Sequence, residues 1–220
     1  MKERNVTVTL DKAKEWFNSG NATLREVALQ AFSKEELNPF DFTKIKTFRD
    51  ALNALDYSGY DMQKIMDKAK NISYYSRASA AAFKLDIVRR ALNLGQDLSL
   101  TKDPEHSYIY YPINPFTTKS STYYEKELAS CDREIIGKIK TEGKEYYVFG
   151  GGVGMTGSKG LGSFMPDDGV GFANAYFGFL GCANVDIARH FSKYFGMLIT
   201  EAKYASIIKD FEIIESKYSI

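Results

Sequence analysis

The sequence is poor in the residues that build most metal sites and disulfide frameworks. Its 220 residues include two cysteines, two histidines and one tryptophan. Two cysteines do not make a disulfide framework, and the sequence has neither an HExxH motif nor paired CxxC motifs for zinc. We therefore expect no metal and no cofactor. We expect Cys131 and Cys182 to be reduced, buried thiols, with a pairing between them as the alternative.

Long apolar runs and an excess of one charge are also missing. No window approaches the roughly 18 apolar residues of a membrane span, and the first residues, MKERNVTVTLDKAKEW, lack the pattern of a secretion signal. The net charge of +1 argues against a uniformly basic nucleic-acid coat and against an acidic tail. We expect no membrane partner. The expected location is the cytoplasm of a bacterium or of a phage-infected cell, with the virion as an alternative.

The first 95 residues are patterned as helices. Apolar residues recur every three or four positions, and Asn21 is placed to cap one of these helices. The run RASAAAFKLDIVRRALNLG predicts a longer helix over about 76–95, which Gly95 ends. Residues 1–70 are therefore predicted to form an N-terminal helical segment.

The character of the sequence changes after residue 100. HSYIYYPI, REIIGKIK, EYYVFGG and GFANAYFGFLGC have strand length and are rich in aromatic or β-branched residues. NVDIARHFSKYFGMLITEAKY then predicts a helix over about 184–204, and DFEII a short edge strand. Residues between Pro115 and Ser130 are expected to form a long loop. Segregated helices and strands predict an α+β fold, with residues 71–220 as a main domain whose antiparallel sheet packs against the two long helices.

A glycine-rich run, FGGGVGMTGSKGLGSF, stands at residues 149–164. Its glycines over 152–157 match the G-x-G-x-x-G spacing of dinucleotide-binding loops. Such a loop must open a helix whose N-terminus holds the pyrophosphate. Two further glycines and Pro166 follow instead, and they disfavour a helix. Lys159 also stands one position too late for a P-loop. The run is therefore predicted to be sheet-edge and turn material.

Candidates for catalysis are few. Asp186 and His190 are four residues apart on the predicted closing helix, which indicates an ordinary Asp–His pair on a solvated face. No local pattern pairs a cysteine with a histidine as an activated nucleophile. The sequence thus predicts no catalytic residues and a protein that is not an enzyme. A pocket that joined His106, His190 and either Asp167 or Asp168 would favour an enzyme instead.

Aromatic residues make up 14% of the sequence, and several tyrosines stand in adjacent pairs. Neighbours in a strand point to opposite faces, so one tyrosine of a pair can pack inward while the other stays outside. VGFANAYF at 170–177 resembles the RNP1 pattern of RNA-binding domains without its basic first residue. Residues 61–90 hold seven Lys or Arg against three Asp or Glu, which suits a phosphate backbone.

Three stretches resemble a large group of uncharacterised proteins from gut bacteria and their phages. They are AKEWFNSGNATLREVALQAFSKEEL (13–37), RASAAAFKLDIVRRALNLG (77–95) and IARHFSKYFGMLITEAKY (187–204). What they share with the group is apolar spacing, which is structural. The resemblance implies a phage or mobile-element setting, and it brings no established activity and no site residues.

Two functional hypotheses follow. The first is a non-enzymatic phage- or prophage-type binding or structural protein, whose aromatic, glycine-rich sheet contacts a protein or glycan and supports self-association. The second is a single-stranded nucleic-acid-binding protein, which stacks bases on tyrosines and holds phosphates with the basic 61–90 region. The predicted contact residues are Tyr108, Tyr110, Tyr111, Tyr146, Tyr147, Phe172, Tyr176, Arg77, Lys84, Arg89 and Arg90.

Overall fold

The computed structural model describes residues 7–19, 21–37, 39–96, 108–157 and 180–218. The chain divides into two compact units, Met1–Asp41 and Phe42–Ile220. This division lies earlier than the predicted boundary near residue 70, because the helices after Phe42 pack into the second unit. No helix in the described part of the chain is long and apolar enough to cross a membrane.

The first unit is a small cluster of helices. It consists of α1 (Leu10–Asn18), α2 (Ala22–Ala31) and α3 (Lys34–Leu37). The side chain of Asn21 caps α2 by accepting hydrogen bonds from two backbone N–H groups, which confirms its predicted role. The apolar faces of these helices meet in a core built on Ala13, Phe17, Ala28 and Leu37.

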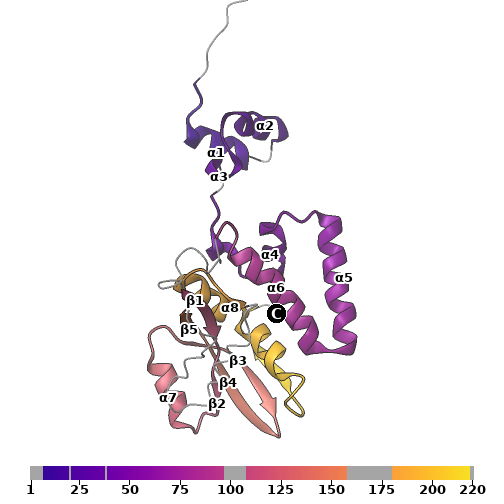
Figure 1. Ribbon diagram of the computed structural model, residues 1–220, viewed down its shortest axis with the longest axis vertical. Coiled ribbons are helices and arrows are strands. Elements are labelled where there is room, and N and C mark those ends of the chain that lie inside the picture. Colours follow the sequence, from indigo (N-terminus) through magenta and orange to yellow (C-terminus); the bar gives the residue numbers. More distant parts are fainter. Residues whose placement is uncertain (1–6, 20, 38, 97–107, 158–179, 219–220) are drawn as a thin grey trace, which may run out of the picture. The chain divides into compact units, whose positions relative to one another are not determined.

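The second unit begins with helices. A short 3-10 turn (Phe42–Lys44) leads to α4 (Phe48–Ala54), α5 (Gly59–Tyr75) and α6 (Arg77–Leu92). Thr47, Ser58 and Ser76 cap these three helices with their hydroxyl groups. Ser76 both ends α5 and caps α6, so the chain reverses within one residue and the two helices pack together (Figure 1).

Strands make up most of the remainder, and every strand pairing is antiparallel. The strands are β1 (Tyr108–Ile113), β2 (Phe116–Thr117), β3 (Glu134–Thr141), β4 (Lys144–Gly150), β5 (Gly152–Gly157) and β6 (Glu212–Ser216). β1 pairs with β5, and a four-stranded sheet has the order β2-β4-β3-β6, with the predicted edge strand at one end. The fold is α+β, as the segregation of helices and strands predicted.

The stretch from Pro115 to Ser130 is not a long loop, and that prediction was wrong. It forms β2 and a further helix, α7 (Thr122–Ala129). The Ser121 hydroxyl caps α7, and the buried ring of Tyr124 lies edge-on to Tyr147 and Phe149 of β4. An apolar anchor of this kind stabilises a helix that is too short to persist alone.

The last helix, α8 (Val185–Tyr204), lies at the centre of the second unit. It contacts α6 on one side and strands β1, β3, β4 and β5 on others (Figure 1). Most of its residues are buried, as expected for a helix covered on several faces. Asn184 caps it, in agreement with the predicted range. α8 is thus the element through which the α6 layer and the sheet are held together.

The described part of the glycine-rich run, residues 149–157, ends β4, turns at Gly151 and forms β5, so that it joins the two sheets. One residue, Gly151, separates β4 from β5, and two residues separate β1 from β2. The chain therefore passes directly from the β2–β4 pair of one sheet to the β1–β5 pair of the other, and the register changes between Ile113–Gly152 and Phe116–Val148. Gly151 has a φ of +88°, and a Cβ there would collide with the carbonyl of Asp132. Residues 158–164 lie outside the described part.

Helix α8 packs directly against this turn, and we call the region the glycine joint (residues 113–115, 149–152, 192 and 196). The Asn114 amide donates hydrogen bonds to the carbonyls of Phe149, at 3.0 Å, and Ser192, at 2.8 Å. The Ser192 hydroxyl donates to the carbonyl of Ile113 at 2.9 Å. A Cβ on Gly196 would overlap the Asn114 side chain. The glycines of this region therefore permit close approach of helix and strands.

Candidate functional site: a cationic groove between helices

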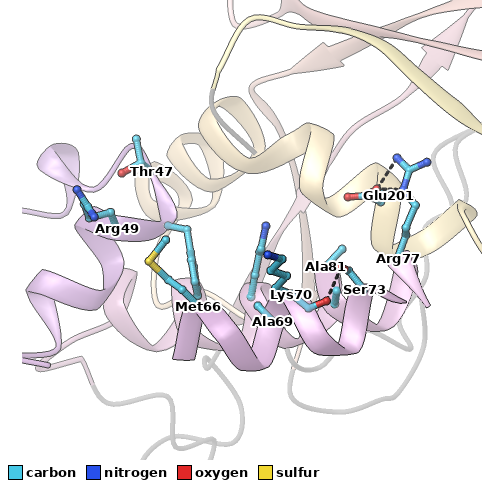
Figure 2. A pocket seen from close by; sticks show the side chains of 12 residues that line it. Thr47, Arg49, Met66, Ala69, Lys70, Ser73, Arg77, Ala81 and Glu201 are labelled. Atoms are coloured by element: carbon cyan, nitrogen blue, oxygen red, sulfur yellow. Dashed lines mark hydrogen bonds and ion pairs between the residues drawn. The ribbon is translucent and has the colours of Figure 1, made fainter. Parts of the chain in front are cut away.

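The candidate site is a groove of about 740 Å³ in the second unit. Residues of α4, α5, α6 and α8, together with the α4 cap residue Thr47, line it (Figure 2). Four of the described lining residues carry a positive charge, and one, Glu201, carries a carboxylate. The cationic residues are Arg49, Lys70, Arg77 and Lys84.

Helical spacing explains why the groove exists. On α5 the lining residues fall at 66, 69, 70 and 73, and on α6 at 77, 80, 81 and 84, which is one face of each helix. Small side chains make up much of both faces, among them Ala69, Ser73 and Ala81. Small side chains leave the floor of the groove hollow, while the long basic side chains border it.

Three of the four cations have no acidic partner among the described residues. Arg49, Lys70 and Lys84 form no ion pair with a carboxylate of the described residues. The Lys84 ammonium lies 5.9 Å from the centroid of the Phe48 ring, a contact typical of a cation over an aromatic face. The described lining therefore has an excess of positive charge that an anion could neutralise.

Arg77 is the exception. Its Nε lies 2.8 Å and its terminal nitrogen 2.7 Å from the same oxygen, Oε1, of Glu201. The carboxylate is buried, with Glu201 only 9% exposed, whereas the Arg77 side chain is half exposed. The pair connects the first residue of α6 to the last turn of α8. Arg77 is thereby held in one orientation.

The cations are spread along the groove. Figure 2 shows Arg49 at one end, Arg77 beside Glu201 at the other, and Lys70 between them. The N-terminal residues of α6 also line the groove, and the positive end of that helix dipole adds to the field. Such an arrangement suits an elongated anion with several charges better than a single small ion.

The structure separates the predicted basic residues into two sets. Arg77 and Lys84 line the groove, while Arg89 and Arg90 both pair with Asp86 outside it. The sequence reasoning did not single out Arg49 or Lys70. Lys70 could have been found from the shared α5 face, but Arg49 joins the site through the packing of α4 on α6, which no local pattern reveals.

The predicted sheet tyrosines are half-buried where their side chains are described. Tyr110 packs against the α6–α8 core, and burial raises the pKa of Tyr111 above its ordinary value. Tyr146 lies edge-on to Phe116, and Tyr147 to Tyr124 of α7. The Tyr108 side chain, Phe172, Tyr176 and the RNP1-like run at 170–177 lie outside the described residues.

The most exposed tyrosines of the described chain are on α5 instead. Tyr60 is 70% exposed, Tyr74 is 74% exposed and Tyr75 is 93% exposed. Tyr74 follows Lys70 by one helical turn, so the two side chains lie on the same side of α5. An exposed ring therefore stands beside the cationic groove, where sequence reasoning had favoured the rings of the sheet.

His190 does not belong to a solvated Asp–His pair, and that prediction was wrong. The imidazole is buried, with Nε2 2.7 Å from the carbonyl oxygen of Ile45 and Phe42 edge-on to the ring. Asp186 is exposed and pairs with Arg189. Because α8 is covered on several sides, the two residues, one turn apart, have different surroundings. His106, Asp167 and Asp168 lie outside the described residues.

The two cysteines are free and differ in exposure. Cys182 is buried, as predicted, and burial raises the pKa of its thiol to about 12. Cys131 is exposed, so its predicted burial was wrong; it lies in the connection between α7 and β3. Among the described residues, no group of three or more His, Cys, Asp or Glu is placed to hold a metal ion.

Comparisons of the chain with protein-family models, with curated proteins and with solved structures gave no match. The geometry and charge of the groove therefore carry the functional proposal.

Proposed function

We propose that this chain is a non-enzymatic binding protein whose groove takes the backbone of a single-stranded nucleic acid. One observation carries the proposal: four cations are distributed along one groove, and three of them lack a described acidic partner. A phosphodiester backbone carries one negative charge per nucleotide and can follow such a line of cations. A ligand with a single charge would leave most of these cations unused.

Exposed tyrosine beside the groove favours a single strand over other polyanions. Single-stranded nucleic acid is commonly bound by a basic groove together with aromatic rings on which bases stack. Tyr74 is exposed and lies on the Lys70 side of α5. The bases of a duplex are already stacked inside it and are not available to stack on this ring.

The alternative, a contact surface on the aromatic sheet, has less support. Tyr110, Tyr111, Tyr146 and Tyr147 are half-buried, and α7 packs over part of β4. These rings contribute to the core more than to a free surface. The phage or mobile-element setting stays a prediction of the sequence resemblance and is compatible with nucleic-acid binding.

The proposal is tested by fluorescence anisotropy with a fluorescein-labelled dT12 oligonucleotide over a salt series. We expect binding that weakens with salt, with a slope of log affinity against log salt of about −2 for three neutralised phosphates. Lys70→Ala should weaken binding roughly tenfold, because a charge-assisted hydrogen bond contributes about 1.5 kcal/mol.

Lys64→Ala is the matched control, because Lys64 is on the same helix, outside the groove, over the Tyr60 ring. It should leave the affinity within about twofold, as a long-range charge change is largely screened. Absence of binding at low salt, or an equal loss in the two variants, would refute the proposal.

A further inference from the structure

We infer that the two ends of the groove have different tasks: Arg49, Lys70 and Lys84 hold phosphates, while the Arg77–Glu201 pair holds the edge of a base. The inference rests on the proposed function and assigns the ligand groups within it. Its starting point is the single carboxylate found among the described lining residues.

The Arg77 end is a poor site for phosphate. Both near nitrogens of Arg77 are directed to Glu201, and the carboxylate compensates the guanidinium charge. Glu201 is buried, so its negative charge is weakly screened. A phosphate placed against this pair would meet a negative charge at short range. Arg49, Lys70 and Lys84, which have no carboxylate partner in the described part of the chain, offer sites without that repulsion.

The same pair is well suited to a base. Arg77 retains N–H groups beyond those used on Glu201, and Oε2 of Glu201 accepts no hydrogen bond from a described residue. The pair thus presents a donor beside an acceptor in a fixed orientation. The Watson–Crick edges of the bases have the complementary pattern, such as O4 beside N3–H in thymine.

Placement along the chain supports this division. Arg77 begins α6 directly after the one-residue turn at Ser76, and Tyr74 precedes that turn on α5. An exposed ring for stacking and a donor–acceptor pair for the base edge therefore lie on either side of one tight reversal. The phosphate-binding cations extend from there toward Arg49, as Figure 2 shows.

The test compares two labelled ligands of equal charge, dT12 and an abasic 12-mer, on the full chain. The wild-type protein should bind dT12 at least fivefold more tightly than the abasic strand. Glu201→Gln should weaken dT12 binding about twofold to threefold and strengthen binding of the abasic strand by a similar factor, so that the fivefold preference disappears. If Glu201→Gln strengthened both ligands equally, Glu201 would only oppose anions, and the inference would be wrong while the proposed function stood.

Arg77→Lys provides a second variant should Glu201→Gln impair folding, which circular dichroism would reveal. Lysine keeps the positive charge but loses the planar set of donors. We expect weaker dT12 binding and unchanged abasic binding, and equal losses for the two ligands would overturn the inference. Failure of the wild-type protein to bind either strand would instead refute the proposed function itself.

Discussion

The glycine joint and the cationic groove lie in the same unit but are packed in opposite ways: the joint is closely packed and the groove is hollow. At the joint, glycines let α8 and the strands approach so closely that an added Cβ would collide. In the groove, small side chains on α5 and α6 leave a hollow of about 740 Å³ bordered by cations. The described start of the glycine-rich run, at Gly150, Gly151 and Gly152, therefore packs against other parts of the chain, whereas the groove, which has no sequence motif, is open.

A glycine-rich sequence can have two structural roles. Glycine allows close approach of any group, whether a phosphate or another piece of backbone. At Gly151 the near group is the carbonyl of Asp132, and at Gly196 it is the Asn114 amide. Where other protein groups already occupy the space beside a glycine, the glycine indicates close packing. A site for an anionic ligand is then expected elsewhere, where positive side chains gather.

The largest expected effect tests the joint. Gly151→Ala should lower the free energy of unfolding by about 3 kcal/mol, because it combines a positive φ with a collision against backbone. Urea denaturation followed by circular dichroism measures the change. Gly59→Ala is the control, since a Cβ there has open space and Gly59 begins a helix. A Gly151→Ala protein as stable as this control would contradict the description of the joint.

A second variant removes the hydrogen bonds of the joint and leaves its glycines in place. Asn114→Ala should destabilise the protein by about 2 kcal/mol, because two carbonyls lose their donor in a buried site. Asn71→Ala, on the exposed face of α5, should change the stability little. The affinity of folded Asn114→Ala protein for dT12 should be unchanged. A loss of affinity as large as that of Lys70→Ala would mean that the glycine joint also affects ligand binding.

The predicted basic residues provide a sharper test of the groove. Lys84→Ala should weaken dT12 binding roughly tenfold, as expected for loss of one charge-assisted contact. Arg90→Ala removes a charge from the same helix, but Arg90 pairs with Asp86 outside the groove. Anisotropy titrations at one salt concentration compare them. Equal losses would mean that general charge, and not the groove, governs binding.

The smallest effect concerns a lysine that follows Glu201 on α8. Burial lowers the pKa of Lys203 to about 8, against an ordinary value of 10.5. The folded protein thus releases this proton before the unfolded chain does, so this residue makes stability rise between pH 8 and pH 10.5. Lys203→Met should be more stable than wild type by about 1 kcal/mol at pH 7.

That advantage should shrink as the pH approaches 10.5, which urea denaturation at several pH values would show. Tyr204→Phe is the comparison variant. Burial raises the pKa of Tyr204 above its ordinary value of 10.0, so this residue changes the stability with pH only above about pH 10. A difference between Lys203→Met and wild type that stayed constant with pH would contradict the assigned cause.

The sequence predicted the elements that depend on local pattern. The helical repeat of α6 and α8, the cap at Asn21 and the edge strand β6 all follow from spacing and cap chemistry. The α7 helix was missed because its anchor, Tyr124, is stabilised by rings of β4 that are distant in sequence. His190 was misplaced for a similar reason, since its partner is the carbonyl of Ile45.

The candidate site could be predicted in part. Arg77 and Lys84 belong to a basic region that composition alone reveals. Arg89 and Arg90 differ from them by pairing with Asp86, which lies within one helical turn of both arginines and is therefore visible in the sequence. The presence of Arg49 and Glu201 depends on how α4 and α8 pack against α6, and side-chain spacing within one helix does not contain that information.

The most direct measurement compares Lys70→Ala with Lys159→Ala for dT12 binding at low salt. Lys159 is the lysine of the glycine-rich run, outside the described residues, so the two variants remove the same charge from the two competing regions. If the groove is the binding site, Lys70→Ala loses roughly tenfold in affinity and Lys159→Ala binds like wild type. The reverse result, with affinity lost only in Lys159→Ala, would contradict the account.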